Sequence, residues 1–364
     1  MYLDNRKKSY APALVFITLA FFSCAIFLSV PAGAQKIRQL PPPPPAPRYK
    51  PKPTPTPEYE VVRVSSNLVM APVSVTNTQG QPVLGLKTSD FRIEEDGHPQ
   101  EIAQLGDPEQ VPLDIALLID VSGSVVARFA FEQQAAASFL QQVLKPEDRA
   151  TIFAIDESPR MIQPLTTAQL AARKLLTVTP SNGYTAFFDS VLAAANYLDK
   201  SSSSSRRRIV VVISDGDDTA RILGVSAAQN RSDSMKLIGV DAQLQLIRKA
   251  QLDTQREVQR AEITFYSINP SGRTMHLNVR TARSEEGMER IAAATGGAAF
   301  VPRNESELSG IFQQIASEIR SQYLLQYYSN NKAGGTTFRR INVSTPAQPQ
   351  LHVRSREGYF PKGK

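Results

Sequence analysis

The sequence is poor in the side chains that support disulfides, thiolate metal sites and imidazole chemistry. It has one cysteine, Cys24, so neither an intramolecular disulfide nor a cysteine-based metal site can form within the chain. Tryptophan is absent, and only three histidines occur in 364 residues: His98, His276 and His352. The chain also has no Gly-x-x-x-x-Gly-Lys-[Ser/Thr] segment, so a phosphate-binding loop of that type is excluded.

The positive charge of the chain is confined to its N-terminal part. The whole sequence has 41 Lys and Arg against 34 Asp and Glu, a net charge of +7. Residues 1–57 hold eight basic side chains and one acidic side chain, which accounts for the whole excess. Residues 58–364 are therefore neutral, with 33 side chains of each sign. Because nucleic-acid affinity comes mainly from basic groups that neutralise phosphates, nucleic acid is not expected as a partner.

The N-terminus has the three parts of a secretory signal peptide. Basic residues Arg6 to Lys8 precede an apolar run from Ala11 to Val30, and the small-x-small sequence Ala32-Gly33-Ala34 follows. We predict a signal peptide over 1–34 and an exported protein located in the periplasm, in the cell envelope or outside the cell. The apolar run is also about as long as a membrane-spanning helix, so an uncleaved anchor is the alternative and would be the only contact with a membrane.

A proline-rich linker follows at 35–57. Ten of the seventeen residues from 41 to 57 are proline, and Pro41 to Pro45 are consecutive. Such a segment cannot pair its backbone and prefers the extended polyproline II form, at about 3.1 Å per residue. We predict a semi-rigid tether of roughly 50 Å that holds the folded part away from a membrane. A ligand for a proline-recognition domain is the alternative.

Residues 111–320 alternate between apolar strands and amphipathic helices. Leu113 to Ile119 is an almost continuous apolar run, as expected for a strand that is buried on both faces. Further strands are expected at 151–155, 209–213, 263–268 and 298–301, with helices at 131–143, 190–198, 244–261, 288–294 and 306–319. This alternation predicts an α/β fold with a doubly wound, mostly parallel sheet that helices cover on both faces.

Both flanks of this α/β region contain short strand-like runs separated by turn signals. The N-terminal flank, 58–110, has such runs at 61–64, 68–75 and 91–94. The C-terminal flank, 321–361, supplies a matching set at 323–328, 338–343 and 351–354. The short strands of the N-terminal flank would make a poor core by themselves.

Three loops in the α/β region carry many side-chain oxygens. They are Asp120–Ser124, Ser181–Asp189 and Ser214–Asp218. In open α/β sheets, ligands bind beyond the carboxyl ends of the strands, where these loops are expected to lie. Carboxylates and hydroxyls, without cysteine or nearby histidine, suit Mg²⁺, Ca²⁺ or Mn²⁺. An octahedral ion held by a few such groups keeps an open position that a partner's carboxylate could fill.

These loops resemble the metal-ion-dependent adhesion site of the von Willebrand factor A domains. That site has the pattern Asp-x-Ser-x-Ser, a threonine in a second loop and an aspartate in a third. The matching residues here are Asp120, Ser122, Ser124, Thr185 and Asp215. The resemblance covers about 111–320 and implies that the first three residues contact a divalent cation, Mg²⁺ in the first place with Mn²⁺ or Ca²⁺ as alternatives. Thr185 and Asp215 would act directly or through water.

The flanks resemble the ends of bacterial exported proteins with a von Willebrand A-related domain. The similar segments are 83–86, 89–91, 95–97 and 322–325. Integrin β subunits are similar in that their metal-binding domain is inserted into a β-sandwich. From this resemblance we expect 58–110 and 321–361 to form the two parts of one smaller β-sandwich. Stable folding of 58–110 alone would contradict this hypothesis.

Several polar residues near the loops have simpler interpretations. Asp189 is expected to start a helix or to brace its loop. Asp217 and Asp218 are expected to be solvated or to tune the charge of the site without touching the ion. The segment 201–208, five serines followed by three arginines, is interpreted as a solvated loop before the next strand. The stretch 219–262 is longer than one crossover helix needs, so the structure of this stretch beside the predicted site is left open.

Together these features predict an exported protein that binds another protein in a cation-dependent manner. The partner is expected to offer an Asp or Glu carboxylate to the cation. An enzyme is not predicted, because Ser122 or Ser124 as a nucleophile would need a base and no histidine falls in the predicted loops. Two alternatives stay open: a structural module of the envelope with a non-functional metal site, and a metal-dependent hydrolase that uses the ion to activate water.

Overall fold

The computed structural model describes residues 68–222, 240–272, 279–331 and 336–361. All of them belong to one compact unit of the chain, Arg63–Lys364. The predicted signal peptide, the linker and the strand expected at 61–64 lie outside the described residues. Among the helices within these ranges, none is long and apolar enough to cross a membrane.

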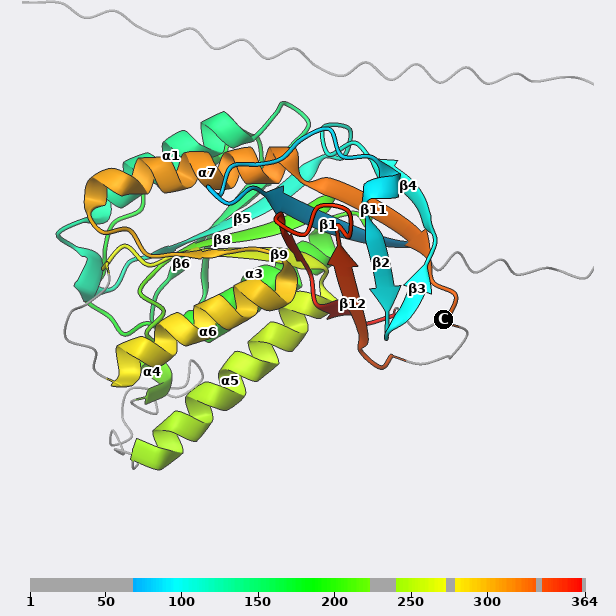
Figure 1. The fold of residues 1–364 in the computed structure, drawn as a ribbon. Coiled ribbons are helices and arrows are strands. Elements are labelled where there is room, and N and C mark those ends of the chain that lie inside the picture. Colours follow the sequence, from blue (N-terminus) through cyan, green and yellow to red (C-terminus); the bar gives the residue numbers. More distant parts are fainter. Residues whose placement is uncertain (1–67, 223–239, 273–278, 332–335, 362–364) are drawn as a thin grey trace, which may run out of the picture. The chain divides into compact units, whose positions relative to one another are not determined.

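A six-stranded sheet forms the centre of the α/β region (Figure 1). Its order is β10-β9-β8-β5-β6-β7, and all neighbours are parallel except β7, which is antiparallel to β6 at the edge. The strands are β5 (Leu113–Asp120), β6 (Arg149–Ile155), β7 (Arg160–Thr166), β8 (Arg207–Ile213), β9 (Ile263–Ile268) and β10 (Ala299–Phe300). The predicted mostly parallel sheet is confirmed, whereas the edge strand β7 was not predicted because its polar, proline-containing sequence lacks a continuous apolar run.

Helices cover both faces of this sheet, so the doubly wound architecture is also confirmed. Alternate residues of β5 enter different cores: Leu117 packs with helices α1, α2 and α7, and Leu118 packs with α3, α5 and α6. The first group comprises α1 (Phe129–Val143), α2 (Ala168–Leu175) and α7 (Leu308–Ser321). The second comprises α3 (Phe187–Ser201), α5 (Val240–Arg260) and α6 (Val279–Thr295), and the short α4 (Thr219–Ile222) lies beside α5.

The flanks form two four-stranded antiparallel sheets, and each sheet combines strands from both flanks. Their orders are β13-β1-β11-β4 and β14-β12-β2-β3. The N-terminal flank contributes β1 (Leu68–Thr76), β2 (Arg92–Glu95), β3 (His98–Gln100) and β4 (Ile102–Gly106). The C-terminal flank contributes β11 (Tyr323–Tyr328), β12 (Arg339–Ser344), β13 (His352–Ser355) and β14 (Gly358–Tyr359). One apolar core contains residues of both sheets, including Val73 and Ile341, which confirms the expected sandwich built from both flanks.

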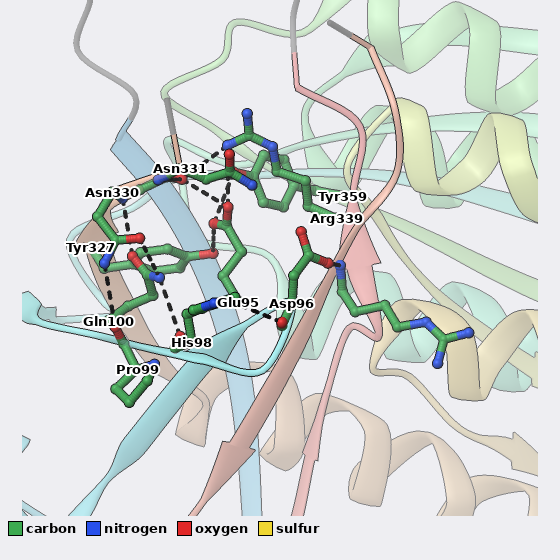
Figure 2. A network of polar contacts seen from close by, with 12 residues as sticks. Glu95, Asp96, His98, Pro99, Gln100, Tyr327, Asn330, Asn331, Arg339 and Tyr359 are labelled. Atoms are coloured by element: carbon green, nitrogen blue, oxygen red, sulfur yellow. Dashed lines mark hydrogen bonds and ion pairs between the residues drawn. The ribbon is translucent and has the colours of Figure 1, made fainter. Parts of the chain in front are cut away.

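A buried carboxylate, Glu95, joins the two small sheets (Figure 2). Its Oε1 lies 3.1 Å from Nη1 of Arg339, and its Oε2 accepts hydrogen bonds from the hydroxyls of Tyr327 and Tyr359. Tyr327 belongs to β11 in one sheet, while Glu95 and Arg339 belong to the other. Burial, and then the charge of Glu95, raise the pKa of Tyr327, so this hydroxyl stays protonated and donates. These hydrogen bonds replace the ones that the polar groups would form with water if they were exposed.

The expected solvated loop at 201–208 is only partly correct, because two of its arginines are buried. Arg207 and Arg208 are 5% and 6% exposed and begin strand β8. Arg207 donates to the carbonyl of Ile319 near the end of α7, and Arg208 donates to the carbonyl of Ala261 just after α5. The two guanidinium groups donate to backbone carbonyls that have no hydrogen-bond partner within a helix, and this explains why the arginines are buried. Residue spacing in the sequence does not reveal these contacts.

Candidate metal centre

The three oxygen-rich loops meet at the carboxyl edge of the central sheet. Asp120 is the last residue of β5, and β8, its parallel neighbour, ends at Ile213. In the register of these two strands Ile119 lies opposite Ile213, so Asp120 and Ser214 follow side by side. The second loop ends where helix α3 begins, at Phe187. The topology thus brings together segments that are about ninety residues apart in the sequence.

Hydrogen bonds connect each pair of these loops. Ser214 Oγ donates to Asp120 Oδ2 over 2.7 Å, which joins the third loop to the first. The backbone N–H of Ser181 donates to the carbonyl of Val121, which joins the second loop to the first. The backbone N–H of Phe188 donates to Asp218 Oδ2 over 3.0 Å, which joins the second loop to the third. The N–H of Thr185 donates to Thr219 Oγ1, directly after the third loop. The three loops therefore form one connected site.

Asp120 is completely buried at the end of β5. Its Oδ1 accepts a hydrogen bond of 2.9 Å from the backbone N–H of Ser122, and its Oδ2 accepts the bond from Ser214. Burial raises the pKa of Asp120, and the charge of Asp156 adds to the rise, while the hydrogen bonds from Ser122 and Ser214 oppose it. The net effect is a pKa above the ordinary value, so ionised Asp120 lacks part of the stabilisation that water would provide.

Asp215 lies in the third loop and is only partly exposed. Burial in the first place, and then the charges of Asp120 and Asp217, raise its pKa, while a hydrogen bond from the N–H of Asp217 and the charge of Arg128 oppose the rise; the net pKa is about 6. In the described part of the chain, neither Asp120 nor Asp215 forms an ion pair. Burial and mutual repulsion therefore oppose the ionisation of both carboxylates in the ion-free protein.

Two of the predicted hydroxyl ligands are described, and they are buried. Ser122 and Thr185 are each 4% exposed. The hydroxyl of Ser122 bonds to Asp120, and Ser122 precedes a short 3-10 helix, Gly123–Val125. The side chain of the fifth predicted residue, Ser124, lies outside what the structure describes. The structure therefore brings Asp120, Ser122, Thr185 and Asp215 to one set of connected loops, and it describes only the backbone of Ser124.

The neighbouring aspartates differ from one another in burial. Asp218 is 2% exposed, so the expectation that it is solvated is wrong. Its Oδ2 accepts a hydrogen bond from the N–H of Phe188 and its Oδ1 accepts one from the N–H of Arg221, so it caps the first turn of α3 from a distant segment. Asp217 is partly buried and accepts a hydrogen bond from Ser284 Oγ of α6. Asp189 lies in the first turn of α3 and pairs with Arg221, as its expected role in bracing the loop implies.

Sequence reasoning missed Asp156, which follows strand β6 at the same edge of the sheet. Its Oδ1 accepts a hydrogen bond of 3.0 Å from Ser181 Oγ, and its carbonyl accepts one from the N–H of Ala186. It thereby positions both ends of the second loop. The signal was available, because Asp156 directly follows the predicted strand at 151–155, just as Asp120 follows its own strand.

The donor chemistry fits a small, hard divalent cation. Among the described residues, no group of three or more His, Cys, Asp or Glu side chains is placed to hold a metal ion. The predicted site has two carboxylates, and its other members are hydroxyls. Such a set suits Mg²⁺, which is commonly bound through one or two carboxylates and retains several waters.

Comparison with known families and structures gives one family match. Residues 115–217 match the von Willebrand factor type A domain, and this segment contains all five predicted site residues. No relative was found among curated proteins.

Solved structures with a similar fold include three bacterial proteins. The PilB minor pilin from Streptococcus sanguinis is 14% identical, with a TM-score of 0.43, over 58% of this chain and 62% of that one. The vWF domain of the type V pili tip protein Mfa5 from Porphyromonas gingivalis is 13% identical, with a TM-score of 0.40, over 57% and 95% of the two chains. A von Willebrand factor type A protein from Catenulispora acidiphila is 11% identical, with a TM-score of 0.44, over 82% and 64%. In the first of these alignments, the chain spans less than two thirds of the length of the minor pilin.

Proposed function

The chain contains a von Willebrand factor type A domain, and on this premise we propose that it is an exported, cation-dependent protein-binding protein. The proposed ligands of the cation are Asp120, Ser122, Ser124, Thr185 and Asp215. Mg²⁺ is the first candidate, and Mn²⁺ and Ca²⁺ are alternatives. The proposed partner is a protein that offers an Asp or Glu carboxylate to the open coordination position.

The observation that carries this proposal is the pair of acidic side chains at neighbouring strand ends. Asp120 is fully buried, Asp215 has a pKa raised to about 6, and the charge of the first contributes to the shift of the second. Ionising both groups costs free energy in the absence of a cation, since burial removes water and their charges repel. A bound divalent cation would offset both effects.

The residues of the site have distinct proposed roles. Asp120 and Asp215 would compensate the charge of the cation, and the hydroxyls of Ser122, Ser124 and Thr185 would add neutral oxygens. When bound, the cation supplies a Lewis-acidic position that attracts a carboxylate. Ser214 orients Asp120 through its hydrogen bond. Asp156 orients the loop that carries Thr185.

We propose a binding protein rather than an enzyme on the basis of where the histidines lie. His98 and His352 are in strands β3 and β13 of the small sheets, whereas the candidate site is at the carboxyl edge of the large sheet. His276 lies outside the described residues. A hydrolase that activates water through the ion would have to use a carboxylate beside the site as its base instead of histidine.

The proposed location follows from the N-terminal sequence. A signal peptide at 1–34 would direct export, and the linker at 35–57 would separate the folded region from the membrane if the leader is retained. We also propose that the rest of the chain consists of a first sandwich segment at 58–110, the α/β domain at 111–320 and a second sandwich segment at 321–361.

Isothermal titration calorimetry of the purified chain with Mg²⁺ and with Mn²⁺ tests the metal site. Wild-type protein is expected to bind one ion, and Asp120→Ala is expected to bind none, because it loses a fully buried carboxylate. Asp217→Asn is the matched control. The substitution removes a negative charge from the loop of Asp215 but keeps a side-chain oxygen that can accept the hydrogen bond from Ser284.

The alternatives give other outcomes in the same experiments. Absence of binding in both wild type and Asp120→Ala would show that the adhesion site is wrong and would favour a structural module. Saturable turnover of an ester or phosphoester that Asp120→Ala abolishes would favour a hydrolase. A pull-down from the cell envelope, with and without EDTA, would then identify the partner.

A further inference from the structure

A polar groove lies between helices α5 and α6. This α5–α6 groove has a volume of about 310 Å³. Arg248 from α5 and Arg283 and Arg290 from α6 line it, together with a single acidic residue, Glu286. None of the predicted metal ligands takes part in it, so the groove is a separate feature of the surface.

The groove carries an excess of positive charge although the folded region as a whole is neutral. Glu286 forms an ion pair with Arg290, four residues later on the same helix. Arg248 and Arg283 are exposed and, within the described residues, neither is in an ion pair. Two guanidinium groups on facing helices are therefore available to an anionic ligand.

The base of the groove offers a donor and an apolar contact as well. Gln251 is 9% exposed, and its Nε2 has no hydrogen-bond partner among the described residues. Ile247, one turn earlier on α5, is buried and also lines the groove. An arginine pair above an amide and an apolar side chain suits a peptide segment, which has both backbone carbonyls and side chains, better than a small inorganic anion.

Helix α6 connects the groove to the third loop of the candidate metal site. Ser284, next to Arg283, donates a hydrogen bond of 2.8 Å to Asp217 Oδ1. Met288, two residues before Arg290, packs on Gly216: a Cβ at position 216 would lie only 2.9 Å from Met288 Cε. Gly216 has a φ of +78°, which favours glycine there and permits this close approach. Helix α6 thus contacts the loop of Asp215 through Ser284 and Met288 and lines the basic groove through Arg283 and Arg290.

We propose that the α5–α6 groove binds an acidic segment of the protein whose carboxylate reaches the cation, so that one partner occupies two neighbouring subsites. This inference rests on the proposed function. Arg248 and Arg283 would pair with carboxylates of that segment, and these pairs would select acidic partners and accelerate association at low ionic strength. The groove would then supply part of the specificity that a single metal–carboxylate contact lacks.

The test uses synthetic peptides as probes of both subsites. Each peptide carries one aspartate joined through a Gly-Ser spacer of graded length to a run of glutamates, and a control set replaces the glutamates with glutamine. Binding to the full chain is measured in Mg²⁺ and in EDTA at two salt concentrations. At the best spacer length, the glutamate peptide is expected to bind roughly two- to tenfold more tightly than its glutamine counterpart, and higher salt should reduce this difference.

Paired variants assign the effect to the groove. The double variant Arg248→Gln/Arg283→Gln should remove the preference for glutamate while leaving Mg²⁺ binding by calorimetry unchanged. Lys249→Gln is the matched control, since it removes a positive charge from the same turn of α5 without lining the groove.

The outcomes separate this inference from the function on which it rests. Equal affinity for glutamate and glutamine peptides at every spacer length, or a preference that survives the double variant, would overturn the groove proposal alone if Mg²⁺ still binds. Failure of Mg²⁺ to bind the wild-type chain would overturn the proposed function instead.

Discussion

The two ends of strand β5 show two opposite environments for a buried aspartate. Asp114, near the start of the strand, and Asp120, at its end, are both 0% exposed. Asp114 contacts two arginines: Arg149 Nη2 lies 2.6 Å from its Oδ2, and Arg206 Nε lies 2.8 Å from its Oδ1. Asp120 accepts hydrogen bonds from neutral donors, and the nearby charges that act on it are acidic.

The pKa values of the two side chains move in opposite directions as a result. Burial alone would raise the pKa of Asp114, but the hydrogen bond from Arg149 and the charges of Arg206 and Arg149 outweigh it, so the pKa is lowered. For Asp120, burial dominates and the pKa is raised. One carboxylate is thus fully compensated by the protein and holds the fold together. The other accepts hydrogen bonds from Ser122 and Ser214, and in the function proposed above a cation compensates its charge.

Neutralising Asp114 should have the largest effect on stability. Asp114→Asn leaves Arg149 and Arg206 without their anionic partner, and we expect the free energy of unfolding to fall by about 2–4 kcal/mol at pH 7. Because the pKa of Asp114 is lowered in the folded protein, this contribution is present above the ordinary pKa and disappears as the pH falls through the folded value.

Urea unfolding of wild type and Asp114→Asn at pH 7 measures this effect. Asp199→Asn is the control, because Asp199 also pairs with an arginine, Arg208, but its side chain is 50% exposed. Equal stabilities of wild type and Asp114→Asn would break the contrast between the two ends of β5.

Neutralising Asp215 should raise the free energy of unfolding, whereas neutralising Asp114 should lower it. Its pKa is about 6 in the folded protein and near the ordinary value of 3.8 in the unfolded chain. The ionised group therefore destabilises the folded state, and this loss develops between about pH 4 and pH 6 and persists above it. In EDTA at pH 7, Asp215→Asn is expected to be about 1–3 kcal/mol more stable than wild type, with little difference at pH 3.

Unfolding curves in EDTA at the two pH values check this prediction. Addition of Mg²⁺ should stabilise the wild type but not Asp215→Asn, which would reverse or reduce the difference. A variant that is less stable than wild type in EDTA at pH 7 would mean that Asp215 contributes to the fold, as Asp114 does.

The affinity for Mg²⁺ should depend on pH through the same group. Below about pH 6, Asp215 binds a proton in the ion-free protein, so protons compete with the metal. The apparent affinity is expected to fall up to about tenfold per pH unit between pH 6 and pH 5, and to vary little above pH 7. Calorimetry from pH 5 to pH 8 tests this, and a profile that is flat through pH 6 would exclude Asp215 from the site.

Much of the candidate site is predictable because it depends on short spacings and on strand order. The pattern from Asp120 to Ser124 lies at the end of a strand that is recognisable by its apolar run. Thr185 precedes a helix and Asp215 follows a strand, as expected from the sequence. Parallel strands place their carboxyl ends at one edge, so residues far apart in the sequence can be assigned to one site. Asp156 satisfies the same rule and could have been included.

Burial of charged residues was much harder to predict. Asp218 and Arg207 look like members of polar, solvated segments, yet each is buried because it supplies a hydrogen bond that a distant helix end requires. Their partners, Phe188 and Ile319, are thirty or more residues away in the sequence. The edge strand β7 and the pairing of both flanks in each small sheet likewise depend on contacts that local patterns do not specify.

The amino-acid sequence by itself determined the class of the fold and the identity of the candidate ligands, since apolar periodicity and residue spacing are local properties. Tertiary structure alone decided which charges are compensated. Asp114 and Asp120 are six residues apart on one buried strand. The serines at 122 and 124 mark Asp120 as a candidate ligand, but no local pattern shows that Asp114 pairs with Arg149 and Arg206. That difference arises because electrostatic energy in a low-dielectric interior depends on distances of a few ångströms between groups that only folding brings together.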